Sequence, residues 1–297
     1  MKDYFTELVY QPVLDVYGAP VIGGMFMLLL YLQFRHPLRR WVRGVVPRLW
    51  VNVGLAVPSL IVLRLLLLPA ELIAASWAAD AGFGLLNLIT MPRWLLLVLG
   101  FLAMDHLLYV WHWANHVVPF LWRFHNVHHT DLDLGITTAF RFHFVEMFMG
   151  VFFRSAGILL FGVPVLMVLV YEVVFQVMVA FQHSNWRLPH RLERWLVLIV
   201  ITPRMHGIHH SIVERETNSN YTNVLSIWDR LYGTLRLNVP QQDIVIGVAA
   251  HQRSEDPAHT LLGSYMLPFK PQQQHMLFPD GSRPDREYVA EKERSLE

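Results

Sequence analysis

The feature that most constrains this chain is an apolar run, residues 16–34, that contains no charged side chain. A helix rises about 1.5 Å per residue, so this run is long enough to cross the hydrocarbon core of a bilayer. A signal peptide would carry positive charge before its apolar run and a small-residue cleavage site after it. Here the arginines follow the run and no such cleavage site is present, so we interpret it as a retained membrane anchor.

Three further apolar blocks follow. A second span is predicted over residues 49–70, interrupted by Arg64, and a third over 94–111. The block 147–182 is split near residues 162–164 by a Gly-Val-Pro sequence, which predicts a helical hairpin of two short passes. Only 16% of the residues are charged, against about a quarter in soluble domains. We therefore predict an all-α integral membrane helical bundle with about four passes, some of them short.

The distribution of arginines predicts the orientation. Five arginines lie between the first two spans, within residues 35–48, whereas residues 71–92 contain neither Lys nor Arg. The positive-inside rule therefore places 35–48 in the cytoplasm and 71–92 outside. Counting passes then brings His112 and His183 to the cytoplasmic side.

The rest of the chain shows no second globular domain. Residues 188–202 are too short for a span, and we expect them to lie along the interface as an amphipathic helix. We divide the chain into an N-terminal transmembrane anchor region over 1–92, a central region over 93–240 that contains most of the histidines, and a polar, partly disordered C-terminal tail over 241–297. A net charge of +1 argues against a nucleic-acid partner.

Histidines are concentrated in the middle of the chain, where twelve of the sixteen fall between His106 and His210. The pattern His-x-x-His-His occurs twice, and a His-x-x-x-His pair precedes it. Side chains at i, i+3 and i+4 share one face of a helix, where imidazoles can converge on a cation. With His183, nine candidate metal ligands result: His112, His116, His125, His128, His129, His183, His206, His209 and His210. One ion takes four to six ligands, so nine indicate two ions.

Other interpretations of these histidines were considered. A single interfacial histidine needs no metal, and His106, His143, His190 and His251 are interpreted in that way. A pH-sensing cluster does not require helical spacing. The zinc-protease pattern His-Glu-x-x-His is absent. The chain has no cysteine, which excludes thiolate-bound metal, but imidazole suits zinc, copper and nickel as well as iron.

Six motifs give the chain a resemblance to a known family. "DHLLYVWHWANH", "LWRFHNVHH", "TTAFRFHFVE", "FQHSN", "HGIHHS" and "NYTNVLSIWDRLYGTL" occur in the order found in the fatty acid hydroxylase/sterol desaturase superfamily. The resemblance covers about residues 105–235. It implies an integral membrane di-iron oxygenase: two Fe ions held mostly by histidine, O2 as co-substrate, and hydroxylation or desaturation of an unactivated C–H bond of a lipid.

The chain departs from the family pattern at three places. Trp113 stands where relatives commonly have Arg, and Phe144 replaces the Pro of the "HPxE" that often follows the second cluster. Some relatives supply another His four residues after the one that matches His183, where this chain has Arg187. A tenth ligand is therefore open, with His190, Asn185 or water as candidates.

Ligating imidazoles need their second nitrogen oriented by another group. Asp105 lies seven residues before His112 in an apolar span, where a carboxylate is costly, so we predict a role at the site or, alternatively, a structural pairing with Arg64 or Arg154. Asn220 and Asp229 are predicted to brace the second triplet. Tyr221 is a third candidate to brace this triplet, but a position in a capped surface helix that starts near Asn223 agrees equally well with the sequence. Glu146 and Arg141 are weaker candidates.

The sequence predicts a lipid hydroxylase or desaturase, and sterols, fatty acyl chains, carotenoids and ether lipids all fit. The alternative is a non-catalytic membrane metal-binding or transport protein, or an inactive relative that acts as a scaffold. No motif for a flavin, nicotinamide or iron–sulfur centre is present, so electrons must come from an external donor, a ferredoxin or a cytochrome b5-like protein with an NAD(P)H reductase. Its predicted docking residues are Arg187, Arg191, Arg194 and Arg204, although a solvated interfacial face explains these four charges equally well.

Overall fold

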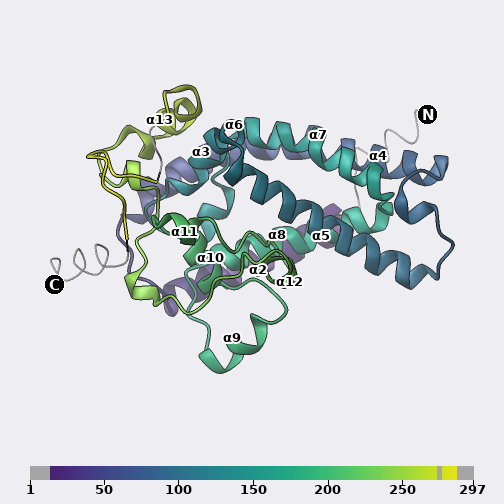
Figure 1. Cartoon of the computed structure of the whole chain (residues 1–297), viewed down its shortest axis with the longest axis horizontal. Helices are drawn as coiled ribbons and strands as arrows, with labels where there is room; N and C mark the ends of the chain where they lie inside the picture. Colours follow the sequence, from purple (N-terminus) through teal and green to yellow (C-terminus); the bar gives the residue numbers. More distant parts are fainter. Residues whose placement is uncertain (1–13, 273–275, 286–297) are drawn as a thin grey trace.

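The computed structural model describes residues 14–272 and 276–285. The regular secondary structure of this part of the chain is all helical, and its extended pairings are three isolated β-bridges. Figure 1 shows long helices along the long axis of the molecule and short elements gathered toward one end. The long helices are α2 (Ala19–Arg35), α3 (Val45–Val62), α4 (Leu68–Ala81), α5 (Arg93–Val117), α7 (Phe144–Phe161) and α8 (Val165–His183). The shorter ones are α6 (Pro119–His129), α9 (His190–Leu196), α10 (Pro203–His209), α11 (Glu214–Thr217), α12 (Ile227–Leu231) and α13 (Leu261–Met266).

Within the residues that the structure describes, five helical segments are long and apolar enough to cross a membrane, which confirms the all-α membrane bundle. They are Asp15–Arg35, Val45–Asn87, Arg93–Val117, Phe144–Phe161 and Val165–His183. The last two are the arms of the predicted hairpin, and each has the length of a full span, where short passes were expected. The chain turns between them at Gly162, whose φ of 69° is the left-handed conformation that glycine adopts most readily, and Pro164 then precedes α8.

The second span is longer than predicted. A five-residue π-helical segment, η2 (Leu63–Leu67), joins α3 to α4, so helix continues past the expected end near residue 70. Glu71 marks that position, but its side chain is fully buried and forms an ion pair with Arg154 of α7. Arg154 also contacts Glu172 of α8 at 2.8 Å. From hydropathy alone, a charged residue such as Glu71 indicates the end of a span. Inside the bundle, however, Arg154 compensates its charge, so the helix continues past it.

The apolar core lies between α4, α5, α7 and α8. Leu72, Met104, Ile158 and Val168 are each less than 1% exposed and belong to one packed cluster. In a membrane the alternative to this packing is contact with lipid tails, so close van der Waals packing stabilises this core, and removal of apolar surface from water does not. This core fixes the direction of α5 and α8, which carry histidines at their ends.

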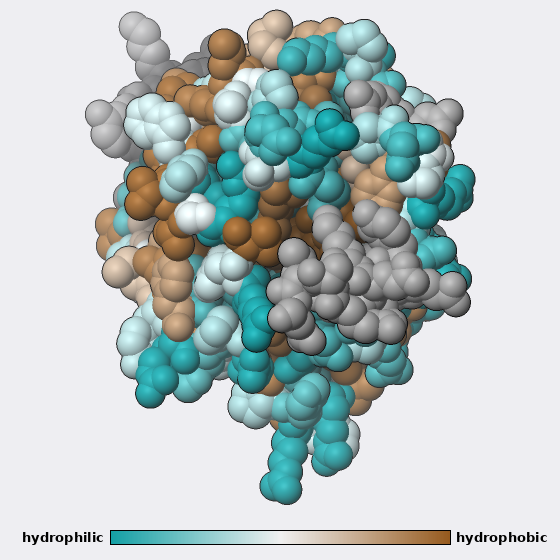
Figure 2. Space-filling view, turned by 90° about the vertical axis from the view of Figure 1, so that its left-hand side faces the viewer, coloured by the Kyte–Doolittle hydropathy of each residue, from teal (hydrophilic) through white to brown (hydrophobic). Residues whose placement is uncertain are grey.

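The region beyond α8 forms a cap of short elements. The predicted interfacial helix over 188–202 is only partly present, since α9 ends at Leu196 and Val200 pairs with Leu225. The segment stays on one side of the bundle, because it leads directly to α10 and the second histidine triplet beside the first. Figure 2 shows that hydrophilic residues predominate over much of this end of the molecule. The three-part division of the chain stays a prediction.

Candidate metal centre

Four helices bring the nine predicted ligand histidines together at the inner end of the cap. His112 and His116 lie in the last turns of α5, and α6 carries the first triplet. His183 is the last residue of α8. The second triplet lies on α10, which begins where the Thr202 side chain accepts the Met205 N–H and Pro203 occupies the first turn. All nine side chains are at most 7% exposed.

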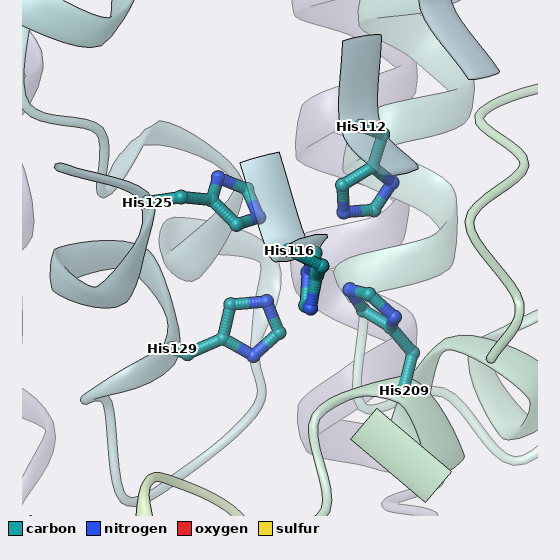
Figure 3. Close-up of side chains that lie close together, drawn as sticks. All are labelled: His112, His116, His125, His129 and His209. Carbon is teal, nitrogen blue, oxygen red and sulfur yellow. The ribbon is translucent and has the colours of Figure 1, made fainter. Parts of the chain in front are cut away.

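The nine imidazoles form two groups, in each of which the potential ligand nitrogens lie within 4.8 Å of one another. Site A comprises His112, His116, His125, His129 and His209, whose rings point toward one another in Figure 3. Site B comprises His128, His183, His206 and His210.

This division explains why His-x-x-His-His occurs twice. In the first triplet, the i, i+4 pair His125 and His129 belongs to site A, while His128 belongs to site B. The second triplet is divided in the opposite sense, with the pair His206 and His210 in site B and His209 in site A. Each motif therefore contributes to both sites, because the i+3 and i+4 side chains lie on opposite flanks of the shared face, about 100° apart around the helix axis.

The donor set fits metal cations. In site B, His183 Nε2 lies 3.0 Å from His128 Nε2 and 2.9 Å from His206 Nε2, so three ring nitrogens converge on one point. In site A both ring nitrogens of His116 and His129 are buried without a hydrogen-bond partner. Burial holds the pKa of His206 well below its usual range and lowers that of His209 to about 3. These imidazoles are therefore neutral, the form that binds metal.

Four imidazoles have their Nδ1–H held by an oxygen, which leaves Nε2 facing the site. His112 donates to the Tyr221 carbonyl at 2.7 Å and His209 to the Ser219 carbonyl at 2.8 Å. His183 donates to the Val179 carbonyl at 2.7 Å. The fourth, His125, lies 2.9 Å from the Glu146 carboxylate, a contact for which the sequence offered only a weak indication. Such outer partners fix the tautomer and the orientation of a ligand.

The sequence suggested that Asp105, Asn220 and Asp229 contact the histidines directly. In the structure none of the three does so. Asp105 accepts hydrogen bonds from Tyr171 Oη at 2.8 Å, the Leu225 N–H at 3.0 Å and Trp228 Nε1 at 2.8 Å, and pairs with neither Arg64 nor Arg154. Arg64 pairs with Asp15.

All three residues instead hold the loop 218–228. Asp229 accepts the N–H groups of Tyr221 and Thr222, at 2.9 and 3.1 Å. Asn220 donates to the Met205 carbonyl at 2.9 Å. This loop carries the carbonyls that orient His112 and His209, so the three side chains position the ligands through its backbone. None of them lines the cavity beside the histidines.

The candidates for a tenth ligand lie elsewhere. The side chain of Asn185 accepts the Arg39 N–H at 2.9 Å and donates to the Arg39 carbonyl at 2.8 Å. His190 is exposed at the start of α9. Tyr221 does not belong to a surface helix: it is 2% exposed, and α12 begins only at Ile227.

A buried network of charged side chains stabilises the C-terminal end of α6. Arg48, expected in a cytoplasmic loop, lies in the first turn of α3 and donates twice to Asp131, each time at 2.9 Å. Arg141 donates to the Val127 carbonyl at 2.9 Å. The nearby guanidinium of Arg48 keeps the pKa of Asp131 below its usual range in spite of its burial.

An apolar cavity of about 100 Å³ opens beside both sites. Its histidine wall contains His112 and His125 of site A and His128, His183 and His206 of site B. Its remaining wall comes from α3, η2, α5, α7 and α8 and is mostly aliphatic and aromatic, including Leu60, Leu63, Trp111, Met147 and Phe175. A cavity of this volume admits a short segment of a hydrocarbon chain.

Comparison with known proteins agrees with this geometry. Residues 97–234 match the family model for fatty acid hydroxylase. The chain is 35% identical over 137 residues to an ornithine lipid hydroxylase, OlsE, of Rhizobium tropici, which covers 46% of this chain and 40% of the relative. It is 30% identical over 136 residues to human alkylglycerol monooxygenase, covering 46% and 29%. Human cholesterol 25-hydroxylase is 29% identical over 138 residues, covering 46% and 49%.

The matched region spans less than half the length of each of these relatives. No solved structure matches the chain. The matched region nevertheless contains all nine histidines, both sites and the loop that orients them. Residues 97–234 are therefore similar in sequence to the fatty acid hydroxylase family and to these relatives.

Proposed function

We propose that this chain is a membrane-bound di-iron oxygenase that hydroxylates an unactivated C–H bond of a lipid, with O2 as co-substrate. The observation that carries the proposal is the division of nine buried histidines into two adjacent groups beside one apolar cavity. Two groups suit two ions, and O2 chemistry suits iron among the metals that imidazole binds. The names of the relatives, which are hydroxylases and monooxygenases, favour hydroxylation over desaturation.

Site A would hold one iron and site B the other. When bound, the two irons would supply the O2 activation needed to break an unactivated C–H bond. The chain itself contributes the position of the substrate and the exclusion of water: Leu60, Trp111 and Phe175 offer a dry wall to an alkyl segment placed against the histidines. The carbonyls of Ser219 and Tyr221 and the carboxylate of Glu146 keep the ligand rings in place.

The alternative of a metal transporter has less support. A transporter is expected to distribute its ligands along a path across the membrane. Both sites instead lie at one end of the spanning helices, where α5 and α8 finish. We propose that this end faces the cytoplasm, in agreement with the arginines of residues 35–48.

An external electron donor completes the proposal. Arg191 and Arg194 on α9 and Arg187 just before it are exposed, and they would attract an acidic ferredoxin or cytochrome b5-like protein. Arg204 is less available, because it forms an ion pair with Glu193.

The first experiment measures iron in the purified protein, with about two per chain expected. His209→Ala removes a donor from site A and His128→Ala one from site B, so each should leave about one. His190→Ala, which changes an exposed histidine outside both sites, should leave two. Stoichiometric zinc without iron in protein from iron-replete cells, and no activity after iron reconstitution, would exclude the di-iron assignment.

The second experiment measures turnover with candidate lipids. Enzyme, lipid and O2 alone should give no product, and addition of a redox partner with NAD(P)H should start the reaction. With 18O2, hydroxylation incorporates one labelled oxygen atom into the product, whereas desaturation incorporates none. Sustained product formation without O2 would rule out an oxygenase.

A further inference from the structure

A second, larger cavity lies outside the histidine sites. It is a groove of about 1160 Å³, bordered by residues 37–42, 132–134 and 241–246 and by Arg187 and Arg204. This volume is sufficient for a small organic ligand. Of its lining, the proposed oxygenase uses only Arg187, as part of the surface for the electron donor.

Arg39 places an unsatisfied cation in this groove. Its Nη1 donates to the side chain of Gln241, but Nε and Nη2 are buried and have no partner. The backbone of Arg39 is fixed on both sides by Asn185, whose side chain accepts its N–H at 2.9 Å and donates to its carbonyl at 2.8 Å. A buried guanidinium with two unused N–H groups is costly unless an anion joins it.

The surroundings add three further arginines. Glu193 and Asp133 favour the charge of Arg39, but Glu193 already forms an ion pair with Arg204. Arg40, Arg187 and Arg204 also line the groove, and burial together with Arg204 lowers the pKa of Arg39 to about 9. The carboxylate in the lining, Asp133, already accepts the N–H groups of Val42 and Arg43, at 2.7 and 2.8 Å. The groove therefore lacks a counter-charge for Arg39.

The position of the groove indicates the source of that counter-charge. The candidate spans α2 and α8 end at Arg35 and His183, so the groove segments 37–42 and 185–190 begin within a few residues of two membrane-crossing helices. Phospholipid phosphates lie at this level, and basic pockets at the ends of spans attract anionic lipids. Leu134, Ile244 and Ile246 give the groove an apolar wall as well.

We propose that the groove binds the phosphate of an anionic phospholipid, with Nε–H and Nη2–H of Arg39 as paired donors. The planar guanidinium fork matches two phosphate oxygens. An acidic redox protein would bring carboxylates to the same arginines, and the test below separates these two partners. The bound lipid would also steady site B: Nη1 of Arg39 packs against Gly207, where any side chain would collide with it, next to His206.

The test uses the full chain in a neutral detergent, with iron bound, and measures binding of short-chain phosphatidylglycerol, phosphatidylcholine and inorganic phosphate by calorimetry. We expect tighter binding of phosphatidylglycerol than of either other probe. Arg39→Gln should weaken it about tenfold, since it removes a charged pair of hydrogen bonds. The matched control Arg191→Gln removes an exposed arginine outside the groove and should leave it unchanged.

Two further variants separate loss of binding from loss of folding. Arg39→Lys keeps the charge but loses the fork, and should give an intermediate affinity. Gln241→Glu supplies an internal carboxylate beside Arg39 and should weaken phosphatidylglycerol binding with Arg39 still in place. Because binding is measured without turnover, the outcome is independent of the oxygenase proposal.

Three results would overturn the proposal. Equal affinity for phosphatidylglycerol and phosphatidylcholine would remove anion selectivity. Inorganic phosphate binding as tightly as phosphatidylglycerol would make the ligand a soluble phosphate instead of a lipid. Loss of binding to an acidic redox protein in Arg39→Gln, with phosphatidylglycerol binding unchanged, would assign the groove to the electron donor.

Discussion

The Nδ1 atom of His125 lies 2.9 Å from Oε1 of Glu146, and both side chains are buried. His125 is a site A histidine on α6, whereas Glu146 stands in the first turn of α7. The contact therefore connects a candidate ligand to a membrane-spanning helix that carries none of the nine histidines. A carboxylate in this position makes the imidazole a more basic ligand and fixes its ring orientation.

Glu146→Gln should weaken iron binding at site A. The amide retains a hydrogen-bond acceptor for Nδ1–H but loses the negative charge, so we expect a loss of about 10–100-fold in iron affinity or activity. Competition with a graded series of chelators measures the affinity, and circular dichroism checks the fold. Retention of both irons at wild-type affinity would show that the carboxylate charge does not act on His125.

Asp229→Ala tests whether the loop orients the ligands. The change leaves the N–H groups of Tyr221 and Thr222 buried without an acceptor, at about 1–3 kcal/mol each, and releases the carbonyl that holds His112. We expect a lower unfolding temperature together with a lower iron content. Asp229→Asn keeps one acceptor oxygen and should recover part of both. A lower unfolding temperature with full iron content would limit Asp229 to a structural role.

Arg154→Met should be among the most destabilising single changes. It leaves Glu71 and Glu172 as buried carboxylates without their counter-charge, which costs about 3–5 kcal/mol. The double variant Arg154→Met with Glu71→Gln removes one of those charges and should recover stability, as measured by unfolding in detergent. If the single and double variants unfold alike, the three charges do not depend on one another.

Eight of the nine histidines were predictable because their helical spacing is visible in the sequence, and His183 because it ends the predicted hairpin. Their division between two sites was not, since it depends on how α6 and α10 are rotated about their axes and on where α5 and α8 end. The groups that orient His112 and His209 are backbone carbonyls, which no residue type reveals.

The predicted limits of the second span were wrong at both ends, and for the same reason. Glu71 suggested the end of a span and Arg48 a cytoplasmic loop, because a charge in isolation is expected in water. Each is buried with a partner that is distant in the sequence: Glu71 with Arg154, and Arg48 with Asp131. Only the packing of α3, α4 and α7 reveals these pairs.

The cytoplasmic position of the histidines is tested by labelling single cysteines, since the chain has none of its own. Thr90 and Ser254 are both exposed; Thr90 lies between the second and third candidate spans and Ser254 in the cap. In sealed cells, Thr90→Cys should react with an impermeant thiol reagent and Ser254→Cys should not. Both should react after permeabilisation. The reverse pattern in sealed cells would place the histidines outside and exclude cytosolic donors.

The cavity beside the histidines offers a direct test of where the lipid lies. Gly150 of α7 lines it, and a side chain built there meets no atom within 4 Å. Leucine favours a helix more than glycine does, so Gly150→Leu should fill the cavity without weakening the fold. We expect both irons to be retained while lipid turnover falls at least tenfold. Gly24→Leu is the matched control, because Gly24 is equally unobstructed but lies on the exposed face of α2 away from the cavity. Full turnover in Gly150→Leu would mean that the substrate reaches the histidines by another route.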